Sequence, residues 1–315
     1  MSGRASSSPL VSVLLAARNA GATLGASVES LLAQTERSFE LLLVDDGSTD
    51  ATAILAARYA RLDARVRVLS RPHRGLTASL DEACGLARGE FIARQDVDDT
   101  SAPERLRAQL DLLESERDAV AATCWTEFVA PLGETVIHYQ PSAAEVAEGL
   151  SRLDPRLLSN PPHPTLLVRR CAFTAAGGYR TAFTRAQDVD LWLRLVEQGR
   201  IGVVTRYLYR VQLSTGSVSS LHSSEQDELR VLAVECALAR RQGRSEAPIL
   251  AAAAAVRPRL PTERERQRRT AAANYFYAAC LASAAPARAR AYCLRALAAD
   301  PLHLRAWVRM LGTCL

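Results

Sequence analysis

Apolar runs alternate with helix-like stretches along the first third of the chain. Strands are predicted where apolar or β-branched residues gather, at 11–16, 40–44, 66–68 and 91–93. Helices are predicted between them, at 23–34, 48–62 and 76–87. Strands without polar alternation are typical of a parallel sheet that is covered on both faces. The pattern therefore predicts an α/β fold with a mostly parallel sheet flanked by helices.

The middle of the chain continues the pattern less regularly. Residues 101–104 (SAPE) have the form of a capping box, and the leucines after them share one helix face. Residues 121–125 predict a further strand, whereas 131–160 give no clear pattern. The stretch 185–199 predicts another helix with one apolar face. The residues of that face are Leu191, Trp192, Leu195 and Val196.

The last third of the chain predicts a C-terminal α-helical extension. Residues 222–315 are rich in alanine, leucine and arginine and contain no convincing strand. Within them, 274–307 resembles one tetratricopeptide-type helix pair. A single pair cannot bury its apolar face alone, so we expect it to pack on the rest of the chain or on another copy. We therefore expect a flexible leader at 1–8, an α/β domain at 9–220 and a helical tail at 221–315.

The positive charge of the chain is concentrated in this tail. The net charge is +5, and residues 221–315 hold 15 arginines against 8 acidic residues, a surplus of +7 that leaves −2 for the first 220. A basic helical tail can contact an anionic membrane or polymer, but solvated helix faces explain most such runs. We expect a cytoplasmic protein with peripheral contact at the inner face of the membrane, and no nucleic-acid partner.

The remaining composition excludes several classes of protein. Hydrophobic residues make up 48% and charged residues 23% of the chain, which excludes general disorder. No run of about 18 apolar residues occurs that would span a membrane. The 7 cysteines are scattered without a CxxC pair, so neither a disulfide framework nor a zinc site is indicated.

Acidic residues follow two of the predicted strands. Asp45 and Asp46 end the second strand, and Asp96, Asp98 and Asp99 follow the fourth. The carboxyl ends of parallel strands lie at one edge of a sheet, so we expect the two clusters to converge. The second cluster could hold Mg²⁺ or Mn²⁺, or it could form a solvated acidic turn. Asp46 could accept a hydrogen bond from a base or ribose, or belong to an Asp-Gly turn.

Two other residues are candidates for chemistry. Asp188 lies at the start of the predicted helix at 185–199, where a carboxylate could act as a general base or favour the helix N-terminus. His163 lies in a proline-rich loop and could be structural or catalytic. Neither a GxGxxG motif nor a P-loop motif occurs, so a dinucleotide fold is not indicated.

The order of these motifs resembles a known family. VSVLLAARN, VDDGSTD, FIARQDVDDTSAPERL, HPTLLVRR, GGY and QDVDLWLRL are similar, in sequence and spacing, to the bacterial inverting glycosyltransferases of family two, which have the GT-A fold. The similarity covers roughly residues 9–215. FIARQDVDDTSAPERL in particular resembles the signature of the branch that builds exopolysaccharide and O-antigen repeats.

The resemblance implies a nucleotide pocket at the ends of the first strands. Ala17 and Asn19 are expected to line it, and Asp46 is expected to contact the base, usually uracil. Arg74 lies in the segment that often completes the pocket. Asp96 is expected to contact the ribose.

The resemblance also implies a metal ion and a general base. Asp98 is expected to hold a divalent cation, Mn²⁺ or Mg²⁺, and Asp188 to be the base. Gln187 stands where the family usually has a glutamate, which removes a neighbouring charge, and Gln95 stands where the signature commonly has methionine. No QxxRW motif follows, so a processive synthase is not expected.

The function implied is single-sugar transfer. We expect a metal-dependent enzyme that moves a hexosyl or N-acetylhexosaminyl group from a nucleotide-diphosphate donor, a UDP-sugar, to a hydroxyl of a glycan or lipid-linked acceptor in cell-surface polysaccharide synthesis. His163 and Trp192 are the residues expected nearest the acceptor. Two alternatives remain: a nucleotidyltransferase that makes sugar nucleotides, although AARNAGAT is a poor version of its phosphate loop, and a non-catalytic glycan-assembly scaffold.

Overall fold

The structure is a computed structural model that describes residues 8–214, 223–257, 259 and 261–312. Its contacts divide the chain into two compact units. The first consists of Met1–Thr126, Gln140–Val211 and Asp227–Val256, and the second of Glu127–Tyr139, Gln212–Gln226 and Arg257–Leu315. The leader expected at 1–8 lies outside the described residues except for Ser8.

The sheet has a parallel half and an antiparallel half. The parallel strands, in spatial order, are β3 (Val66–Arg71), β2 (Phe39–Asp46), β1 (Val11–Ala17) and β4 (Phe91–Asp96). Beyond β4 come β8 (Leu167–Arg169), β6 (Ala119–Val129), β9 (Arg200–Gln212) and β5 (Thr100–Ser101), and β7 (Thr135–Tyr139) pairs with β6. β8 runs antiparallel to both β4 and β6. The α/β class is confirmed, and the predicted parallel order holds from β3 to β4.

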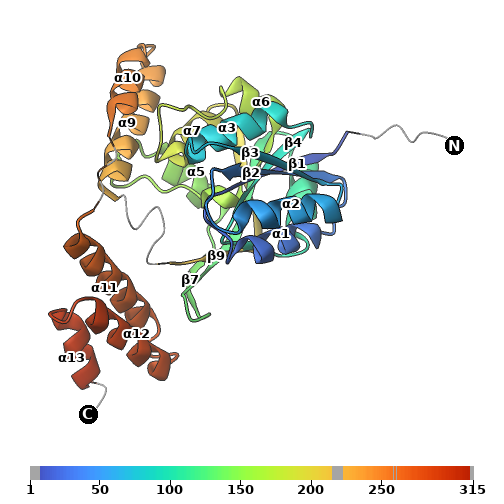
Figure 1. Ribbon diagram of the computed structural model, residues 1–315. Coiled ribbons are helices and arrows are strands. Elements are labelled where there is room, and N and C mark those ends of the chain that lie inside the picture. Colours follow the sequence, from blue (N-terminus) through green and yellow to red (C-terminus); the bar gives the residue numbers. More distant parts are fainter. Residues whose placement is uncertain (1–7, 215–222, 258, 260, 313–315) are drawn as a thin grey trace. The chain divides into compact units, whose positions relative to one another are not determined.

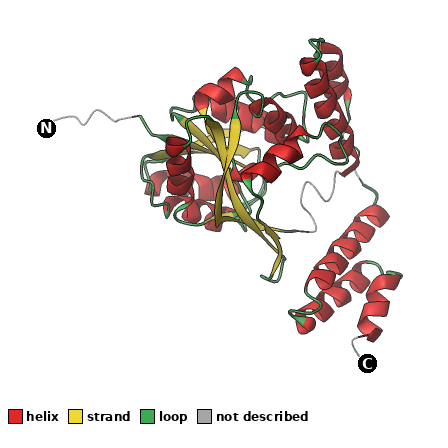
Figure 2. Ribbon diagram, turned by 180° about the vertical axis from the view of Figure 1, so that it is seen from behind, coloured by secondary structure: helices red, strands yellow, loops and turns green. Residues whose placement is uncertain are grey.

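Helices cover both faces of the parallel strands, which lie between two helical layers in Figure 2. One face packs on α1 (Leu24–Leu32), α2 (Thr52–Leu62) and α4 (Arg105–Ser115). The other packs on α3 (Leu76–Leu86), α5 (Ala143–Ser151), α6 (Arg170–Ala175) and α7 (Gln187–Leu195). Successive strand residues alternate between the layers: Val13 and Leu15 join the first, and Leu14 joins the second. Both faces are thus buried, which explains why β1 and β2 consist mostly of apolar residues.

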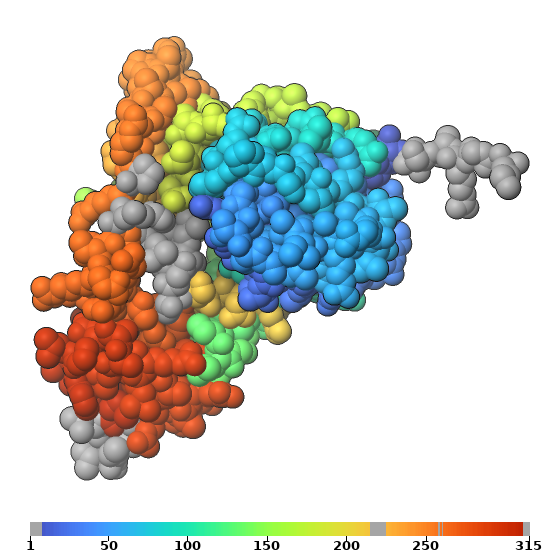
Figure 3. Space-filling model, viewed as in Figure 1, coloured from blue at the N-terminus to red at the C-terminus, as the bar shows by residue number. Residues whose placement is uncertain are grey.

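The order of the elements is visible on the surface of the first unit. The face that Figure 3 presents is formed largely by blue and cyan segments, which belong to the first βα units of the chain. Figure 1 shows α1 and α2 on this side of the sheet. The strands under them end at one edge, where the loops described below begin.

Two local predictions were incomplete or wrong. The capping box expected at 101–104 is absent: α4 begins at Arg105 after Glu104, which makes no side-chain cap, and Ser101 lies in β5. The Ser101 hydroxyl instead donates to the Gln95 side chain at 2.7 Å. The stretch 131–160, which gave no pattern, contains β7 and α5, and α5 starts with a capping box between Ser142 and Glu145.

Helices α9 (Ser223–Arg241) and α10 (Ala247–Ala255) pack within the first unit from residue 227 to 256. Apolar residues of α9, among them Leu229, Ala233 and Ala237, share a core cluster with Val189 and Leu193 of α7. The boundary expected after residue 220 therefore does not coincide with the division of the chain by contacts. Residues 215–222 lie outside the described part.

The second unit is mostly helical. α11 (Glu263–Cys280), α12 (Pro286–Ala299) and α13 (Leu304–Gly312) follow one another. Tyr277 and Tyr292 are buried between α11 and α12 with their rings 5.3 Å apart. This pair falls in the segment predicted to resemble a tetratricopeptide unit, and that identity stays a prediction. No helix among the described residues is long and apolar enough to cross a membrane.

Candidate active site

The loops that follow β1 and β2 are joined side by side. The Asn19 N–H donates to the Ser48 hydroxyl at 3.0 Å, and the Asn19 side-chain oxygen accepts from the Thr49 N–H at 2.9 Å. Ala20 and Gly21 N–H groups are bound in the same way by Thr52 and Asp50, at 2.8 and 2.9 Å. These contacts explain why polar residues follow both strands.

A third loop, after β3, is held by Asp46. This carboxylate accepts from the His73 Nδ1 at 2.7 Å, the Arg74 N–H at 2.8 Å and the Gly75 N–H at 2.9 Å. Burial alone would raise the pKa of Asp46, but these three bonds hold it below its ordinary value. We call residues 18–21, 47–52 and 72–75 the strand-end loops.

Arg18 and His73 connect the first and third strand-end loops. Arg18 donates to the His73 Nε2 at 2.8 Å, so the other ring nitrogen carries the proton that reaches Asp46. Gly47 has a φ of +72° and lies so close to the third loop that a Cβ on it would be 2.7 Å from the backbone nitrogen of His73. The Asp-Gly turn is therefore required by both the backbone angle and the close approach of the third loop.

The sheet register brings the two acidic clusters to either side of one strand end. Asp45 is paired with Ala17 across β2 and β1, and Asp96 is paired with Ala16 across β4 and β1. The convergence expected from the sequence is present, with Ala17 between the clusters. Arg74, whose side chain is 65% exposed, lies beside them in the third loop and is 3.9 Å from Glu82.

Asp96 is fixed by a buried cation. The Arg94 side chain is 1% exposed and forms an ion pair with the Asp96 carboxylate, which is itself 36% exposed. The Asp96 N–H donates to the Tyr209 hydroxyl at 3.1 Å, and its carbonyl accepts from the Ser27 hydroxyl at 2.9 Å. Asp96 thus has a set orientation and a partly neutralised charge before any ligand arrives.

Asp98 is in a different electrostatic state. Burial and the nearby charge of Asp96 both raise the pKa of Asp98, and Arg94 only partly opposes them. No arginine or histidine in the described part of the chain forms an ion pair with it. A carboxylate destabilised in this way by burial and a like charge fits a cation ligand.

The divalent cation implied by the resemblance could be held here by one or two carboxylates, but not by a larger group of protein ligands from the described part of the chain. No group of three or more His, Cys, Asp or Glu side chains that could enclose a metal occurs among the described residues. Mg²⁺ and Mn²⁺ sites in phosphate chemistry commonly use one or two carboxylates, with substrate oxygens and water completing the shell. Asp98, with Asp96 beside it, matches that smaller set.

Gln95 holds the turn that carries these carboxylates. Its side chain is buried, donates to the Asp99 carbonyl at 3.0 Å and to the Ser27 hydroxyl at 3.3 Å, and accepts from Ser101. A methionine there could make none of these bonds. The glutamine therefore ties the turn at 96–99 to α1 and β5.

Asp188 lies at the start of α7, the second residue of that helix. Its carboxylate accepts from the Asn160 amide at 3.3 Å. Burial raises the pKa of Asp188, and the helix N–H groups, Asn160 and the charge of Arg230 oppose that rise without cancelling it. Burial keeps the pKa of the Tyr179 hydroxyl well above its ordinary value, and the charges of Asp96 and Asp188 add to that rise.

Two residues at the site have unusual backbone angles. In the described part of the chain, the non-glycine residues with positive φ are Asn19, at 49°, and Ala186, at 53°. Such conformations are unfavourable for side-chain-bearing residues and persist where surrounding bonds impose them. One lies in the first strand-end loop and the other immediately precedes the start of α7, two residues before Asp188.

His163 and Trp192 lie deeper than expected of acceptor contacts. The His163 Nε2 is 2.8 Å from the Tyr179 hydroxyl, and burial with the nearby charge of Arg94 keeps the pKa of His163 well below its ordinary value. Trp192 is 1% exposed and packs in the core between α7 and the sheet. His163 is thus 7% exposed and bonded to Tyr179, and Trp192 is a core residue, while contact of either with an acceptor stays a prediction.

Sequence reasoning missed several residues that hold the site. Arg94, Tyr209, His73 and Asn160 each bond directly to an expected site residue. Arg94 carries a signal, since it is a charge inside an apolar strand. For the other three no local signal exists, because each partner is at least 27 residues away.

The chain matches a family model and several proteins of known or assigned type. Residues 12–180 match the model described as glycosyl transferase family 2. The chain is 34% identical over 215 residues to EpsE of Bacillus subtilis (strain 168), which carries a glycosyltransferase name, covering 65% of this chain and 74% of that protein. It is 27% identical over 209 residues to the uncharacterized glycosyltransferase MJ1057 of Methanocaldococcus jannaschii, covering 65% and 71%.

Solved structures share the fold. Residues 1–349 of S. aureus TarS in complex with UDP-GlcNAc align with a TM-score of 0.58 at 18% identity, covering 96% of this chain and 88% of that one. The mannosyltransferase PcManGT of Pyrobaculum calidifontis, in complex with GDP-Man and Mn²⁺, aligns with a TM-score of 0.55 at 19% identity, covering 98% and 85%. At these identities the likeness concerns the fold alone.

Proposed function

Because the chain belongs to glycosyl transferase family 2, we propose that it transfers one sugar, with inversion, from a UDP-sugar to a hydroxyl of a glycan or lipid-linked acceptor in cell-surface polysaccharide synthesis. One observation carries the proposal. Asp188 lies in the first turn of α7, accepts a hydrogen bond from Asn160 at 3.3 Å and has a pKa raised by burial. A carboxylate of raised proton affinity near an acidic, loop-lined site is suited to general-base chemistry.

The strand-end loops form the nucleotide side of the proposed site. Asp46 anchors the third loop, and we propose that one edge of its carboxylate, with Asn19 and Ala17, also faces the base. Asp96, held by Arg94, contacts the ribose. Arg74, exposed beside this edge, adds a positive charge for the diphosphate. The solved relatives support a nucleotide sugar, since they were obtained with UDP-GlcNAc and GDP-Man.

A divalent cation, Mn²⁺ or Mg²⁺, would be held by Asp98 with Asp96 beside it. When bound, such an ion neutralises charge on a diphosphate leaving group. The raised pKa of Asp98 is the structural support for this placement.

The transfer step follows from these positions. Asp188 accepts the proton of the acceptor hydroxyl while the oxygen attacks the anomeric carbon of the sugar. The bond from that carbon to the diphosphate oxygen breaks, and the electron pair leaves with the nucleoside diphosphate. Attack opposite to the leaving group inverts the configuration, and Asn160 keeps the base oriented through its hydrogen bond.

We propose that the second unit brings the enzyme to an anionic membrane surface. Residues 257–315 contain 11 arginines and 3 acidic residues, a surplus of +8. On α13, Leu304, Trp307 and Val308 follow i, i+3, i+4 spacing and are 73, 47 and 63% exposed. A basic helix with an exposed apolar stripe and a tryptophan suits the interface of an anionic bilayer.

Vesicle flotation tests the membrane proposal. The full chain should float with vesicles containing phosphatidylglycerol, and Trp307→Ala with Leu304→Asp should reduce the floated fraction. Ile54→Ala, which removes an equally exposed apolar residue of α2, is the matched control and should float like the wild type. Equal flotation of all three proteins, or equal binding to neutral vesicles, would show that α13 and its charge do not mediate attachment.

A panel of nucleotide sugars with Mn²⁺ or Mg²⁺ tests the reaction itself. Thermal-shift and hydrolysis measurements should show stabilisation by UDP and slow release of UDP from one sugar nucleotide, more with a divalent cation than with EDTA. Release of pyrophosphate from UTP and a sugar phosphate would indicate a nucleotidyltransferase instead. No stabilisation by any nucleotide diphosphate in either metal would remove the donor assignment.

A further inference from the structure

Helix α9 reaches the neighbourhood of Asp188 through one arginine. Arg230 donates through Nε to the Pro155 carbonyl at 2.9 Å and through Nη2 to the Leu158 carbonyl. Two residues further on, Asn160 donates to the Pro161 carbonyl at 3.1 Å and to the Asp188 carboxylate at 3.3 Å. A continuous set of bonds therefore runs from α9 through this loop to Asp188.

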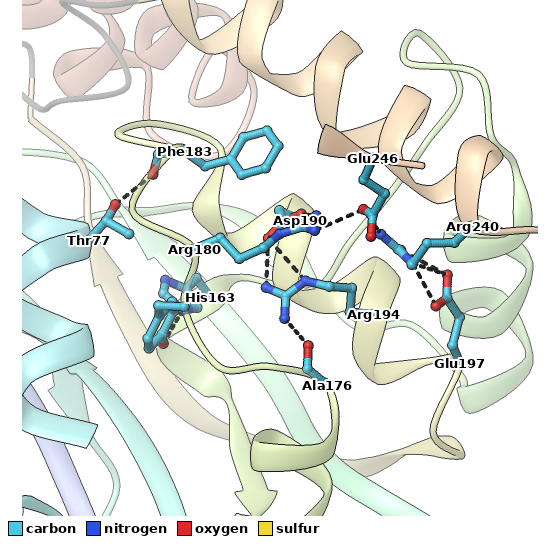
Figure 4. Close-up of polar contacts among 11 residues, drawn as sticks. Thr77, His163, Ala176, Arg180, Phe183, Asp190, Arg194, Glu197, Arg240 and Glu246 are labelled. Carbon is cyan, nitrogen blue, oxygen red and sulfur yellow. Dashed lines mark hydrogen bonds and ion pairs between the residues drawn. The ribbon is translucent and has the colours of Figure 1, made fainter. Parts of the chain in front are cut away.

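A second set of bonds joins α7 to α9 and α10, and Figure 4 shows it. Asp190, two residues after Asp188, is 1% exposed and pairs with Arg180 and Arg194. Arg180 also pairs with Glu246 at 2.8 Å, and Arg240 of α9 pairs with Glu246 at 2.6 Å. Arg240 pairs in addition with Glu197 at 2.8 Å. These ion pairs fix the body of α7 but do not touch Asp188 itself.

Apolar packing completes the attachment of α7. Ala186 and Val189, on either side of Asp188, share a buried cluster with Leu229 and Ala233 of α9. Thr77 of α3 donates to the Phe183 carbonyl at 2.7 Å, which holds the segment leading into α7. The strained backbone of Ala186 is thus surrounded by fixed groups, as a persistent left-handed residue requires.

We propose that Arg230 is a positioning residue for the general base, because it fixes the loop that carries Asn160 against Asp188. The inference rests on the proposed role of Asp188 as the base. The two arginines of α9 therefore differ in role. The Arg230 contacts orient the Asp188 carboxylate through Asn160, whereas the Arg240 contacts only stabilise the fold.

The charges around Asp188 support this separation. Burial raises the pKa of Asp188, and the Asn160 bond and the positive charge of Arg230 lower it. The Tyr179 hydroxyl, which is bonded to His163, stays neutral, because burial keeps the pKa of Tyr179 well above its ordinary value. Arg240, in contrast, pairs with Glu197 and Glu246. Removal of Arg230 should therefore have two effects: it frees the loop that carries Asn160, and it raises the pKa of Asp188.

The test compares Arg230→Met with Arg240→Met in the full chain. Both variants remove one arginine of α9 and its bonds, but only the first contacts the Asn160 loop. Arg230→Lys keeps the charge and gives a milder variant in case the methionine variant does not fold. Turnover, the KM for the sugar nucleotide, UDP affinity, the pH profile of kcat/KM and Tm are measured for each, with Asp188→Asn in the same panel.

For Arg230→Met we expect about a 10-fold to 100-fold loss in kcat, as misplacement of a catalytic group typically causes, with UDP affinity unchanged. The acidic limb of the kcat/KM profile of Arg230→Met should move to higher pH. Arg230→Lys should show a smaller loss of kcat and a smaller shift of that limb. Arg240→Met should lower Tm while keeping kcat and the pH profile of the wild type.

Equal losses of kcat in Arg230→Met and Arg240→Met, or an unmoved acidic limb in the Arg230 variants, would overturn the inference. Asp188→Asn separates that result from a failure of the proposed function. If Asp188→Asn is inactive while the two arginine variants behave alike, only the positioning role is lost. If Asp188→Asn keeps near-normal turnover, the base assignment itself is lost.

Discussion

The strand-end loops and the region around Asp188 are held in place by different kinds of bond. The loops at 18–21, 47–52 and 72–75 are joined mostly by backbone N–H groups to short side chains, over separations of 28 to 32 residues, and the Arg18 side chain reaches His73 across 55 residues. The base region, formed by the start of α7, the loop with Asn160 and α9, depends on arginines that reach across 66 to 75 residues. One side is built into the sheet edge, and the other is assembled from the second half of the first unit.

This difference suggests a division of labour. The loops at the sheet edge are rigid before a ligand binds, because three bonds already saturate much of Asp46. The base region carries a carboxylate whose ionisation is opposed by burial and restored by neighbours. We therefore expect substitutions at the sheet edge to change binding, and substitutions in the base region to change turnover or stability.

The largest effect on activity is expected from Asp188→Asn. The amide cannot accept a proton, so turnover should fall by about 10² to 10⁴, the range typical for loss of a general base. Transfer of radiolabelled sugar at saturating donor measures it. Asp111→Asn, an exposed aspartate on α4, is the control and should keep wild-type turnover. A rate for Asp188→Asn close to the control would exclude the role.

The largest effect on stability is expected from Asp190→Ala. Arg194 would be left as a buried cation without a carboxylate partner and Arg180 would keep only Glu246, and breaking such buried pairs typically costs about 3–5 kcal/mol of unfolding free energy. Chemical denaturation with and without UDP measures it. Asp118→Ala removes the partner of an exposed arginine, Arg200, and should be indistinguishable from the wild type. Similar midpoints for both variants would show that the ion pairs around Asp190 contribute little.

A smaller effect is expected from Asp46→Asn at the sheet edge. The two carboxylate oxygens of Asp46 accept hydrogen bonds from His73, Arg74 and Gly75. The side chain of asparagine has one accepting oxygen, so the variant cannot accept all three bonds. Loss of a bond to a charged acceptor costs about 1.5–3 kcal/mol, and we expect at least about tenfold weaker UDP binding. Turnover at saturating donor should change much less. A loss confined to turnover would contradict the assignment of this edge to the nucleotide.

The strand-end loops were more predictable from the sequence than the region around Asp188. The parallel strands, Asp46, Asp96 and the turn at Gly47 were foreseeable, because a strand that ends in polar residues has a fixed place at the sheet edge. Arg94 was visible as a charge in an apolar run. The function of Gln95 was not, since its partners Ser27 and Ser101 are identified only when α1 and β5 lie beside it.

The base region was foreseeable only in part. Asp188 at a helix start was recognised, but Asn160 lies in a proline-rich loop with no pattern, and Arg230 is one of many arginines in the tail. Trp192 was expected near the acceptor, yet it is 1% exposed and packs on the buried face of α7. Contacts between segments far apart in the sequence, rather than local pattern, decided these positions.

The smallest effect expected is a shift in pH dependence. Because burial raises the pKa of Asp188 above its ordinary value of 3.8, the carboxylate is protonated, and lost as a base, at a higher pH than a free aspartate. The kcat/KM profile of the wild type should therefore fall on the acidic side before pH reaches that value. Activity that persists unchanged down to 3.8, in a protein shown to be folded there, would mean that Asp188 is not desolvated in the working enzyme.

Calorimetric titration of UDP with Mn²⁺ into Asp46→Asn and Asp188→Asn tests the division between the two regions most directly. The account predicts that Asp188→Asn binds UDP with the affinity of the wild type although it does not transfer sugar. It predicts that Asp46→Asn binds UDP at least about tenfold more weakly. Weakened binding in Asp188→Asn together with wild-type affinity in Asp46→Asn would contradict the account.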